Sequence, residues 1–222
     1  MPIGVLIHGC HLQATGWEDI VWGDPEKGIL GRIPKALQVA HDRRADLIYW
    51  GTGASEKDGL TEAAYTFNYA VQRAGSLPPF KGLDVYQVQS LLQKTAFIDL
   101  ETQNTKQEIK RCLGVCHARD ISTLILVSSP THIGRCITEA EVLRAAGYAK
   151  GINIEATASD TCYANSAPSD VLILEPPHRG DRPDVPFYKT LRRVNRFRKE
   201  HGTAEKLNKE LNALFDRFEP LV

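Results

Sequence analysis

Apolar positions along this chain follow two alternating patterns, short continuous runs and longer stretches with helical spacing. The runs rich in Val, Ile and Leu predict strands at IGVLI (3–7), LIYW (47–50), AFIDL (96–100), TLILVSS (123–129), INIEATA (152–158) and VLILE (171–175). Between them, apolar residues three and four positions apart predict helices within 26–44, 61–74, 85–93, 105–118 and 132–146. The tail, 187–218, has the pattern of one or two charged amphipathic helices.

This alternation of strands and helices is typical of a parallel sheet covered on both faces. It predicts a Rossmann-like, doubly wound α/β fold, with a mostly parallel sheet of about five to six strands and C-terminal helices. With 222 residues and no internal repeat or low-complexity linker, the chain is expected to form a single α/β domain over 1–222. Residues 1–176 would form the sheet core, and 177–222 the C-terminal loop and helices.

Charge and composition narrow the class of partner. The 27 basic and 27 acidic residues cancel, which argues against nucleic acid and acidic membranes as partners. The N-terminus, MPIGVLIHG, lacks the basic region of a signal peptide, and no segment approaches about 20 uninterrupted apolar residues. We therefore expect a cytoplasmic protein with a small-molecule ligand and no membrane contact, either a monomer or a homodimer.

The five cysteines do not have the spacing of a zinc site. Cys112 and Cys116 lie one helical turn apart within an amphipathic pattern, which favours half-buried helix residues over metal ligands. Metal binding by His8, His11 and His132 is a weaker alternative, because no H-x-x-x-H spacing supports it. No metal site is predicted.

Polar residues gather where the predicted strands end, and in open α/β sheets this is where ligands bind. The first two strands are followed by the segments His8-Gly9-Cys10-His11 and Gly51-Thr52-Gly53-Ala54-Ser55. The second segment would let backbone N–H groups approach an anion. It is neither a dinucleotide fingerprint nor a P-loop, and a plain tight turn is the alternative.

The segment DLETQNTKQE, after the third strand, holds two kinds of candidate. Thr105 and Glu108 fit a capping box that starts a helix and needs no further function. Glu101 and Asn104 precede this cap, over the edge of the sheet. A carboxylate there could act as a general base, bind a ligand hydroxyl or hold a basic neighbour.

The segment LVSSPTHIGR, after the fourth strand, raises a question of charge. Ser129 fits the N-cap of a helix and Pro130 its first position. His132 and Arg135 then lie in the first turns, where the helix dipole disfavours cations. A bound anion would resolve this conflict by accepting from both side chains. An ion pair of Arg135 with Glu139, with a neutral His132, is an equal alternative.

The Pro-rich segment EPPHRGDRP follows the sixth predicted strand. Its position over the same edge of the sheet makes His178 and Arg179 candidate ligand contacts. A solvated turn with ion pairs at the rim is the alternative.

The order of several of these residues resembles that of the YdcF/SanA/ElyC-like family of bacterial proteins. The matching positions are Arg32, Gly51-Thr52-Gly53, Glu62, Glu101 with Asn104-Thr105-x-x-Glu108, and Thr131-His132 with Arg135. The resemblance spans roughly residues 3–150. It implies a Rossmann-like fold with a polar pocket at the strand ends, lined by Arg32, Glu62, Glu101, Asn104, His132 and Arg135. It also implies S-adenosylmethionine as a possible ligand. The chain departs from the family where His8-Gly9-Cys10-His11 replaces a Gly-rich turn.

The first function that fits these residues is that of a small-molecule enzyme, a hydrolase or group transferase. Its substrate would be anionic, bearing a phosphate or a carboxylate, and bound at the carboxyl ends of the strands. His132 would be the acid, base or oxyanion donor, and Glu101 the general base or orienter. Arg32 and Arg135 would hold the anion, and Asn104 would position the substrate. His8, Thr131, His178 and Arg179 complete the candidate substrate-binding set.

Two alternatives remain open. The chain could bind a nucleoside-type ligand such as S-adenosylmethionine without catalysis, with Gly51-Thr52-Gly53 near the ligand and Glu62 or Glu101 accepting from ribose hydroxyls. It could also be a cysteine-nucleophile amidohydrolase. Cys10 would then be the nucleophile, one of His8, His11 and His132 the base, and Glu101 the orienter.

Overall fold

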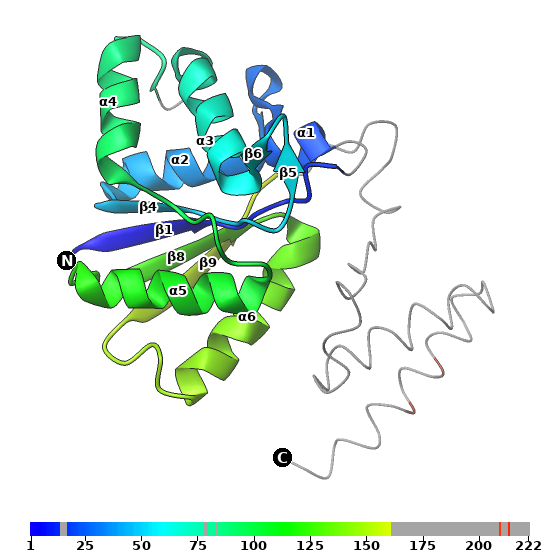
Figure 1. Cartoon of the computed structure of the whole chain (residues 1–222), viewed down its shortest axis with the longest axis vertical. Helices are drawn as coiled ribbons and strands as arrows, with labels where there is room; N and C mark the ends of the chain where they lie inside the picture. The colour runs from blue at the N-terminus through cyan, green and yellow to red at the C-terminus, as the bar shows by residue number, and fades with distance from the viewer. Residues whose placement is uncertain (14–16, 78–79, 83, 161–208, 210–212, 214–222) are drawn as a thin grey trace. The chain divides into compact units, whose positions relative to one another are not determined.

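Five parallel strands form the central sheet, in the spatial order β7-β4-β1-β8-β9 (Figure 1). Their bounds are β1 Ile3–Ile7, β4 Leu47–Trp50, β7 Ala96–Ile98, β8 Thr123–Ser128 and β9 Asn153–Ala158. Each neighbouring pair is parallel, and Val5 in the central strand lies opposite both Ile48 and Ile125. The Rossmann-like α/β fold predicted from the sequence is confirmed.

This computed structural model describes residues 1–13, 17–77, 80–82, 84–160, 209 and 213. The chain divides into two compact units, Met1–Asp170 and Val171–Val222, and the sheet belongs to the first. The predicted strand at 171–175 lies outside the described residues, and so do most of the predicted tail helices. The single-domain organisation of 1–222 stays a prediction.

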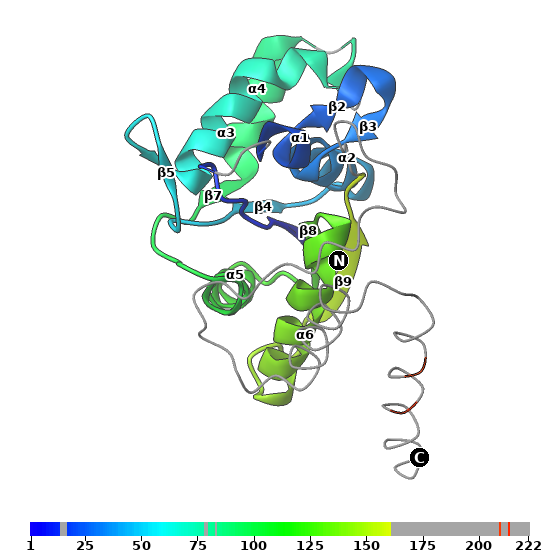
Figure 2. The ribbon, with the colours of Figure 1, turned by 90° about the vertical axis from the view of Figure 1, so that its right-hand side faces the viewer.

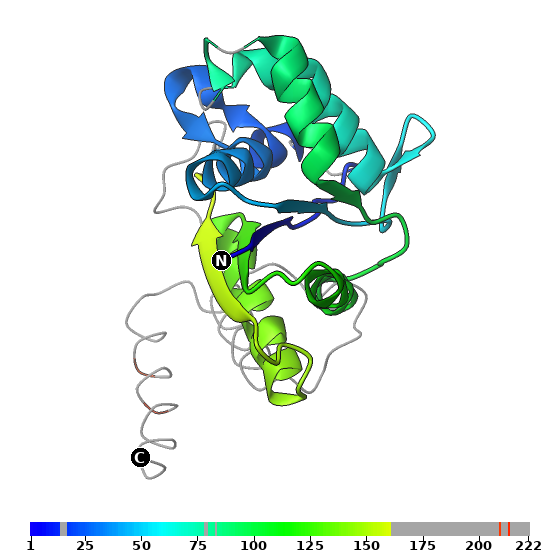
Figure 3. The same ribbon diagram turned by 90° about the vertical axis from the view of Figure 1, so that its left-hand side faces the viewer.

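Helices cover both faces of the sheet, as Figures 2 and 3 show from opposite sides. One face carries α2 (Arg32–Arg43), α3 (Glu62–Arg73) and α4 (Val85–Thr95), and the other carries α5 (Thr105–Ala118) and α6 (Pro130–Ala145). Each was predicted within a few residues of its observed bounds, because its apolar positions recur at helical spacing. Within the described ranges, no helix combines the length and the apolar character needed to cross a membrane.

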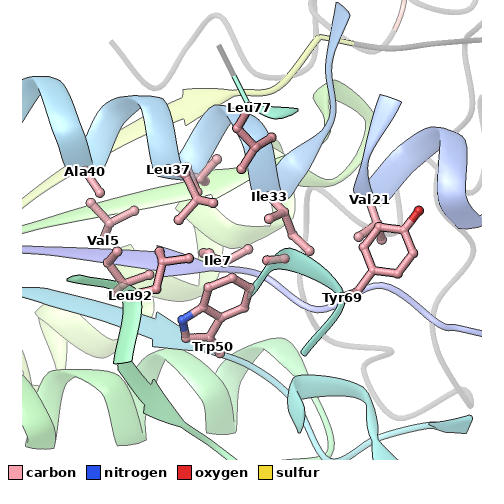
Figure 4. Close-up of a cluster of buried hydrophobic side chains, with 14 of the residues drawn as sticks. Val5, Ile7, Val21, Ile33, Leu37, Ala40, Trp50, Tyr69, Leu77 and Leu92 are labelled. Atoms are coloured by element: carbon pink, nitrogen blue, oxygen red, sulfur yellow. The ribbon is translucent and has the colours of Figure 1, made fainter. Parts of the chain in front are cut away.

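Alternation along the strands divides the core into two layers. Val5 and Ile7 pack on the face of α2, α3 and α4, whereas Leu6 packs on the face of α5 and α6. Figure 4 shows Trp50 among the aliphatic side chains of the first layer, which include Ile33 and Leu37 of α2. Burial of both faces explains why the strands appear in the sequence as continuous apolar runs.

Short elements at the carboxyl end of the sheet were not predicted. They are α1 (Trp17–Val21), the antiparallel pair β2 (Gly23–Asp24) and β3 (Ile29–Leu30), the hairpin β5 (Glu56–Lys57) and β6 (Leu60–Thr61), and the 3-10 turn η1 (Pro25–Lys27). A further short element, the 3-10 turn η2 (Ala74–Ser76), follows the C-terminus of α3. They are too short to show a hydrophobic period. The Asp58-Gly59 dipeptide was a sequence signal for the hairpin that the prediction missed. Both residues have the positive φ that its tight turn requires.

The strand order reverses beside β1, the first strand of the sheet along the chain. The chain moves from β1 to β4 and β7 on one side, and then returns to β8 and β9 on the other. In doubly wound folds ligands bind at the carboxyl ends of the strands flanking such a reversal. Here His8 follows β1 directly and Ser129 follows β8 directly.

Candidate functional site

Buried polar atoms that lack a hydrogen-bond partner concentrate at one end of the sheet. Among the described residues they are His8 Nε2, Arg32 Nε, Trp50 Nε1, Thr61 Oγ1, Glu62 Oε1 and Ser159 Oγ. Each belongs to the last residue of a strand, to the residue just after a strand, or to the first residue of a helix. Native proteins pair nearly all such atoms within the protein or with bound molecules. Their concentration marks this edge of the sheet as the candidate site.

The centre of the site is a buried pair formed by His8 and Glu108. His8 Nδ1 lies 2.5 Å from Glu108 Oε2, and the two side chains are 0% and 1% exposed. Glu108 therefore fixes the orientation of the imidazole ring and directs Nε2 away from itself. An imidazole oriented by a carboxylate, with its second nitrogen available, is the arrangement used for acid–base catalysis.

Backbone geometry holds Glu108 against the sheet. The backbone N–H of Gly9 donates to Glu108 Oε1 at 3.2 Å. A Cβ placed on Gly51 would lie only 1.7 Å from the same oxygen, so only glycine leaves room for the carboxylate. The glycines after β1 and β4 thus hold the Glu108 carboxylate, Gly9 by its N–H and Gly51 by the space it leaves.

The capping box predicted at Thr105 and Glu108 is wrong by one residue. Asn104 is the N-cap of α5, and its Oδ1 accepts from the backbone N–H of Gln107 at 3.0 Å. Gln107 Oε1 in turn accepts from the backbone N–H of Gln103. Asn caps helices better than Thr does. With Asn104 as the cap, Glu108 is the fourth helical residue, and its carboxylate pairs with His8 instead of the helix N-terminus. The Asn-Thr-x-x-Glu motif contained Glu108, but its interpretation as part of a capping box gave Glu108 no role in the site.

The charge state of His8 is set by opposing effects. Burial alone lowers the pKa of its imidazolium, but the charges of Cys136 and Glu108, together with the hydrogen bond to Glu108, outweigh burial and raise it to about 10. At neutral pH His8 is therefore protonated, and Nε2 carries a hydrogen that it can donate.

Arg32 joins the two strand ends beside the reversal point. It is the first residue of α2 and is 5% exposed. Its Nη1 donates to the carbonyl oxygen of Gly9, and its Nη2 donates to Ser129 Oγ at 2.7 Å. This explains why Ser129 occupies the predicted N-cap position of α6 without capping it through its side chain. The guanidinium brings a buried positive charge to the site.

Glu62 is a second buried carboxyl group beside Gly9. It is the first residue of α3, and its Oε2 accepts a hydrogen bond from Ser55 Oγ at 2.6 Å. Burial, followed by the nearby charge of Glu108, raises the pKa of Glu62 to about 8, although Ser55 and Arg32 oppose this rise. Glu62 is therefore mainly neutral at neutral pH.

His132 lies beside His8, but both of its ring nitrogens have partners. Nδ1 is 2.8 Å from Ser128 Oγ, and Nε2 is 3.2 Å from Thr105 Oγ1. The two imidazole rings meet edge to face with centroids 5.7 Å apart. The sequence proposed His132 for acid–base chemistry, whereas the geometry favours His8 for that role and His132 for support.

The thiol nearest these histidines is that of Cys136, one helical turn after His132. Its Sγ lies 3.5 Å from His132 Nδ1 and is fully buried. Cys10, the predicted nucleophile, is half-buried. The structure brings Cys136 into the His8–Glu108 cluster, and the sequence signal that was missed is its i+4 spacing from His132.

Glu101 turns outward instead of toward His8. Its carboxylate pairs with Arg111 of α5, with Nη2 at 3.0 Å from Oε1, and its side chain is 72% exposed. Hydrogen bonding to Arg111 lowers the pKa of Glu101. The described structure therefore separates Glu101 from the buried groups, and Glu108 takes the orienting position expected of it.

The loop after β4 uses several of its polar groups within the protein. Gly53 N–H donates to the carbonyl of Thr102 at 2.9 Å, and Ala54 N–H donates to Thr52 Oγ1 at 3.1 Å. A Cβ on Gly53 would lie 2.2 Å from the carbonyl oxygen of Leu100. Close packing against the loop after β7 thus accounts for this glycine without a ligand.

Other candidates lie at the rim. Thr131 and Arg135 are half-buried on the first two turns of α6. The alternative pairing of Arg135 with Glu139 stays a prediction. Thr131 Oγ1 contacts Ser129 Oγ at 3.2 Å. His178 and Arg179 lie outside the described residues.

A metal site stays without support within the ranges that the structure describes. No three His, Cys, Asp or Glu side chains there are grouped so that they could hold a metal ion. His11, a candidate in the weaker metal hypothesis, is exposed.

Comparison of the chain with protein-family models, with characterised proteins and with solved structures finds no match. The resemblance to the YdcF/SanA/ElyC-like family therefore stays a prediction.

Proposed function

We propose that this protein is a small-molecule enzyme, a hydrolase or group transferase, that acts on an anionic substrate at the carboxyl edge of the sheet. The observation that carries the proposal is the buried pair of His8 and Glu108, 2.5 Å apart, which leaves His8 Nε2 without a partner among the described residues. His8 takes the acid–base role, and Glu108 orients and stabilises its imidazolium.

The chemistry of the buried groups favours an anion. Arg32 and the His8 imidazolium each bring a positive charge, Glu108 brings one negative charge, and Glu62 is mainly neutral. The partnerless atoms of Arg32, Trp50 and protonated His8 are hydrogen-bond donors, and the hydroxyls of Thr61 and Ser159 can also donate. A phosphate or carboxylate group offers the acceptors that such a set requires.

In the reaction that we propose, Arg32 holds the anionic group near Gly9 and Ser129. The Nε2–H of His8 donates its proton to the leaving oxygen or nitrogen as the bond from that atom to phosphorus or to the carbonyl carbon breaks. A water molecule, or the hydroxyl of an acceptor in a transferase, forms the new bond to the same phosphorus or carbon, and the proton that it loses returns to His8. Glu108 stabilises the imidazolium before this transfer and fixes its tautomer afterwards. General acid catalysis of this kind contributes about 10²–10⁴-fold to a rate.

The test is a turnover screen with nucleotides, phosphate esters and carboxylic amides, followed by variants of the pair. His8→Asn and Glu108→Gln are expected to lower kcat by about 10²-fold or more on any substrate found. The matched controls are His41→Asn and Glu141→Gln, because both residues are exposed and form ion pairs with neighbours on their own helices. Their kcat should stay within about twofold of the wild type.

Equal turnover by His8→Asn and the wild type would contradict the assigned role. Calorimetry with S-adenosylmethionine tests the non-catalytic alternative on the same protein. Heat of binding with that ligand, together with no turnover across the panel, would replace the enzyme proposal by that of a nucleoside-type binder. The cytoplasmic location and the absence of nucleic-acid and membrane partners stay predictions.

A further inference from the structure

The two carboxyl oxygens of Glu62 have different environments. Oε2 accepts from Ser55 Oγ at 2.6 Å, whereas Oε1 is buried without a hydrogen-bond partner among the described residues. Glu62 as a whole is 2% exposed. A buried carboxylate with one oxygen unpaired is costly, so its surroundings favour the neutral acid.

The hydrogen bond from Ser55 indicates which oxygen holds the proton. The backbone N–H of Leu12 donates to Ser55 Oγ at 3.2 Å, and the hydroxyl of Ser55 donates to Glu62 Oε2. Because Oε2 already accepts a hydrogen bond, the proton of the neutral acid belongs on Oε1. Oε1 then becomes an O–H donor.

This donor lies against the backbone at the centre of the site. A Cβ on Gly9 would lie 2.1 Å from Glu62 Oε1, so the glycine brings the carboxyl group close to the turn that follows β1. Gly9 also donates its N–H to Glu108 and accepts from Arg32. The two carboxyl groups and the guanidinium thus surround one half-buried glycine.

The following inference rests on the proposed function. We propose that Glu62 acts as a neutral acid whose Oε1–H donates a hydrogen bond to the anionic group of the substrate. Loss of this proton then places a negative charge beside the bound anion and weakens binding. This role is the reverse of the one expected from the sequence, in which a Glu62 carboxylate accepts from ribose hydroxyls. The site thereby selects anionic groups over neutral hydroxyl-bearing ones.

The groups that face Glu62 determine the pH at which binding changes. Glu108, from α5, favours the neutral form by its like charge. The hydroxyl of Ser55, the charge of Arg32 from α2, and the backbone N–H of Cys10, in the turn after β1, favour the carboxylate. Burial is the largest influence and also favours the neutral form. Together they bring the pKa of Glu62 to about 8, so binding of an anion should weaken as pH rises through that value.

Inorganic sulfate is the probe for this inference, because its charge stays constant over the range used. Its affinity for the full chain is measured by calorimetry between about pH 6 and about pH 9, below the range in which His8 loses its charge. We expect the wild type to lose at least about tenfold in affinity over this range. Glu62→Gln keeps a neutral donor of the same shape and should show little dependence on pH.

Two further measurements keep the test decisive. Ser55→Ala removes the donor that favours the carboxylate, so its loss of sulfate affinity should move to higher pH. Carbon-13 NMR of side-chain carboxyl groups, compared between the wild type and Glu62→Gln, gives the titration of Glu62 without any ligand. Glu141→Gln, an exposed substitution, should reproduce the wild-type sulfate curve.

The outcomes separate this inference from the proposed function. Sulfate binding with the same dependence on pH in the wild type and in Glu62→Gln overturns the role of Glu62 alone. A Glu62 titration near the ordinary value of 4.5 has the same consequence. No sulfate binding by the wild type at about pH 6 contradicts both proposals, because each requires an anion at this site.

Discussion

Glu108 Oε2 lies 2.5 Å from His8 Nδ1, although 100 residues separate the two along the chain. His8 follows the central strand β1, and Glu108 lies in the first turn of α5, on the face of the sheet covered by α5 and α6. Gly51 leaves the space that the carboxylate occupies, and the backbone N–H of Gly9 donates to its Oε1. This pair is the reference point for the predictions below.

Removing the charge of Glu108 should release the proton of His8. In Glu108→Gln, burial of the imidazolium remains while one of its stabilising partners is lost. The pKa of His8 should then fall from about 10 by at least about two pH units. Nitrogen-15 NMR of the imidazole rings measures this directly, with Glu141→Gln as the control. A His8 titration unchanged by Glu108→Gln would show that another group holds the proton.

Stability should depend on pH through the same pair. The folded-state pKa of His8 is raised above 6.5, so its stabilising contribution is complete below that pH and is lost as pH rises toward about 10. One such proton corresponds to about 1.4 kcal/mol per pH unit in the free energy of unfolding. Urea denaturation at a series of pH values measures this slope. Glu108→Gln should flatten it, and equal slopes in the two proteins would contradict the prediction.

A methyl group on Gly51 should displace Glu108. In Gly51→Ala the new Cβ would lie 1.7 Å from Glu108 Oε1, so the carboxylate must move and the His8 pair breaks. We expect a loss of about 1–3 kcal/mol in the free energy of unfolding. In a Glu108→Ala background the same substitution should cost much less, because the clashing group is absent.

The control for this substitution is Gly114→Ala in the middle of α5, where a Cβ meets nothing within 4 Å. It should stabilise the protein by about 0.5–1 kcal/mol, since alanine favours the helix. Chemical denaturation of the wild type, the three single variants and the double variant completes the comparison. If Gly51→Ala and Gly114→Ala have the same effect, the close contact with Glu108 has no energetic consequence.

Replacing Arg32 by lysine should separate the two strand ends. A lysine brings a positive charge but cannot donate at once to the Gly9 carbonyl and to Ser129 Oγ as the guanidinium does. We expect a loss of about 1–3 kcal/mol in the free energy of unfolding, and weaker sulfate binding by calorimetry. Arg43→Lys is the matched control, because Arg43 forms an exposed pair with Glu155. Equal stability of the two variants would contradict the anchoring role of Arg32.

The sequence by itself determined the five strands of the sheet and the helices between them, together with the edge at which polar residues gather. These features are local, because hydrophobic periodicity reports which side of each element is buried. Alternation along β1 and β4 therefore matches the two core layers, and the polar residues after each strand lie at the carboxyl end as expected.

Only the tertiary structure decided which of these polar side chains meet. The sequence favoured Glu101 over Glu108, and His132 over His8. The spacing of apolar residues within a helix does not show how that helix is rotated against the sheet. Because Asn104 is the N-cap of α5, Glu108 is the fourth helical residue instead of the third, about 100° further around the helix than a capping box would place it. The contact with His8 then depends on β1 occupying the centre of the sheet, which strand pairing over long distances determines.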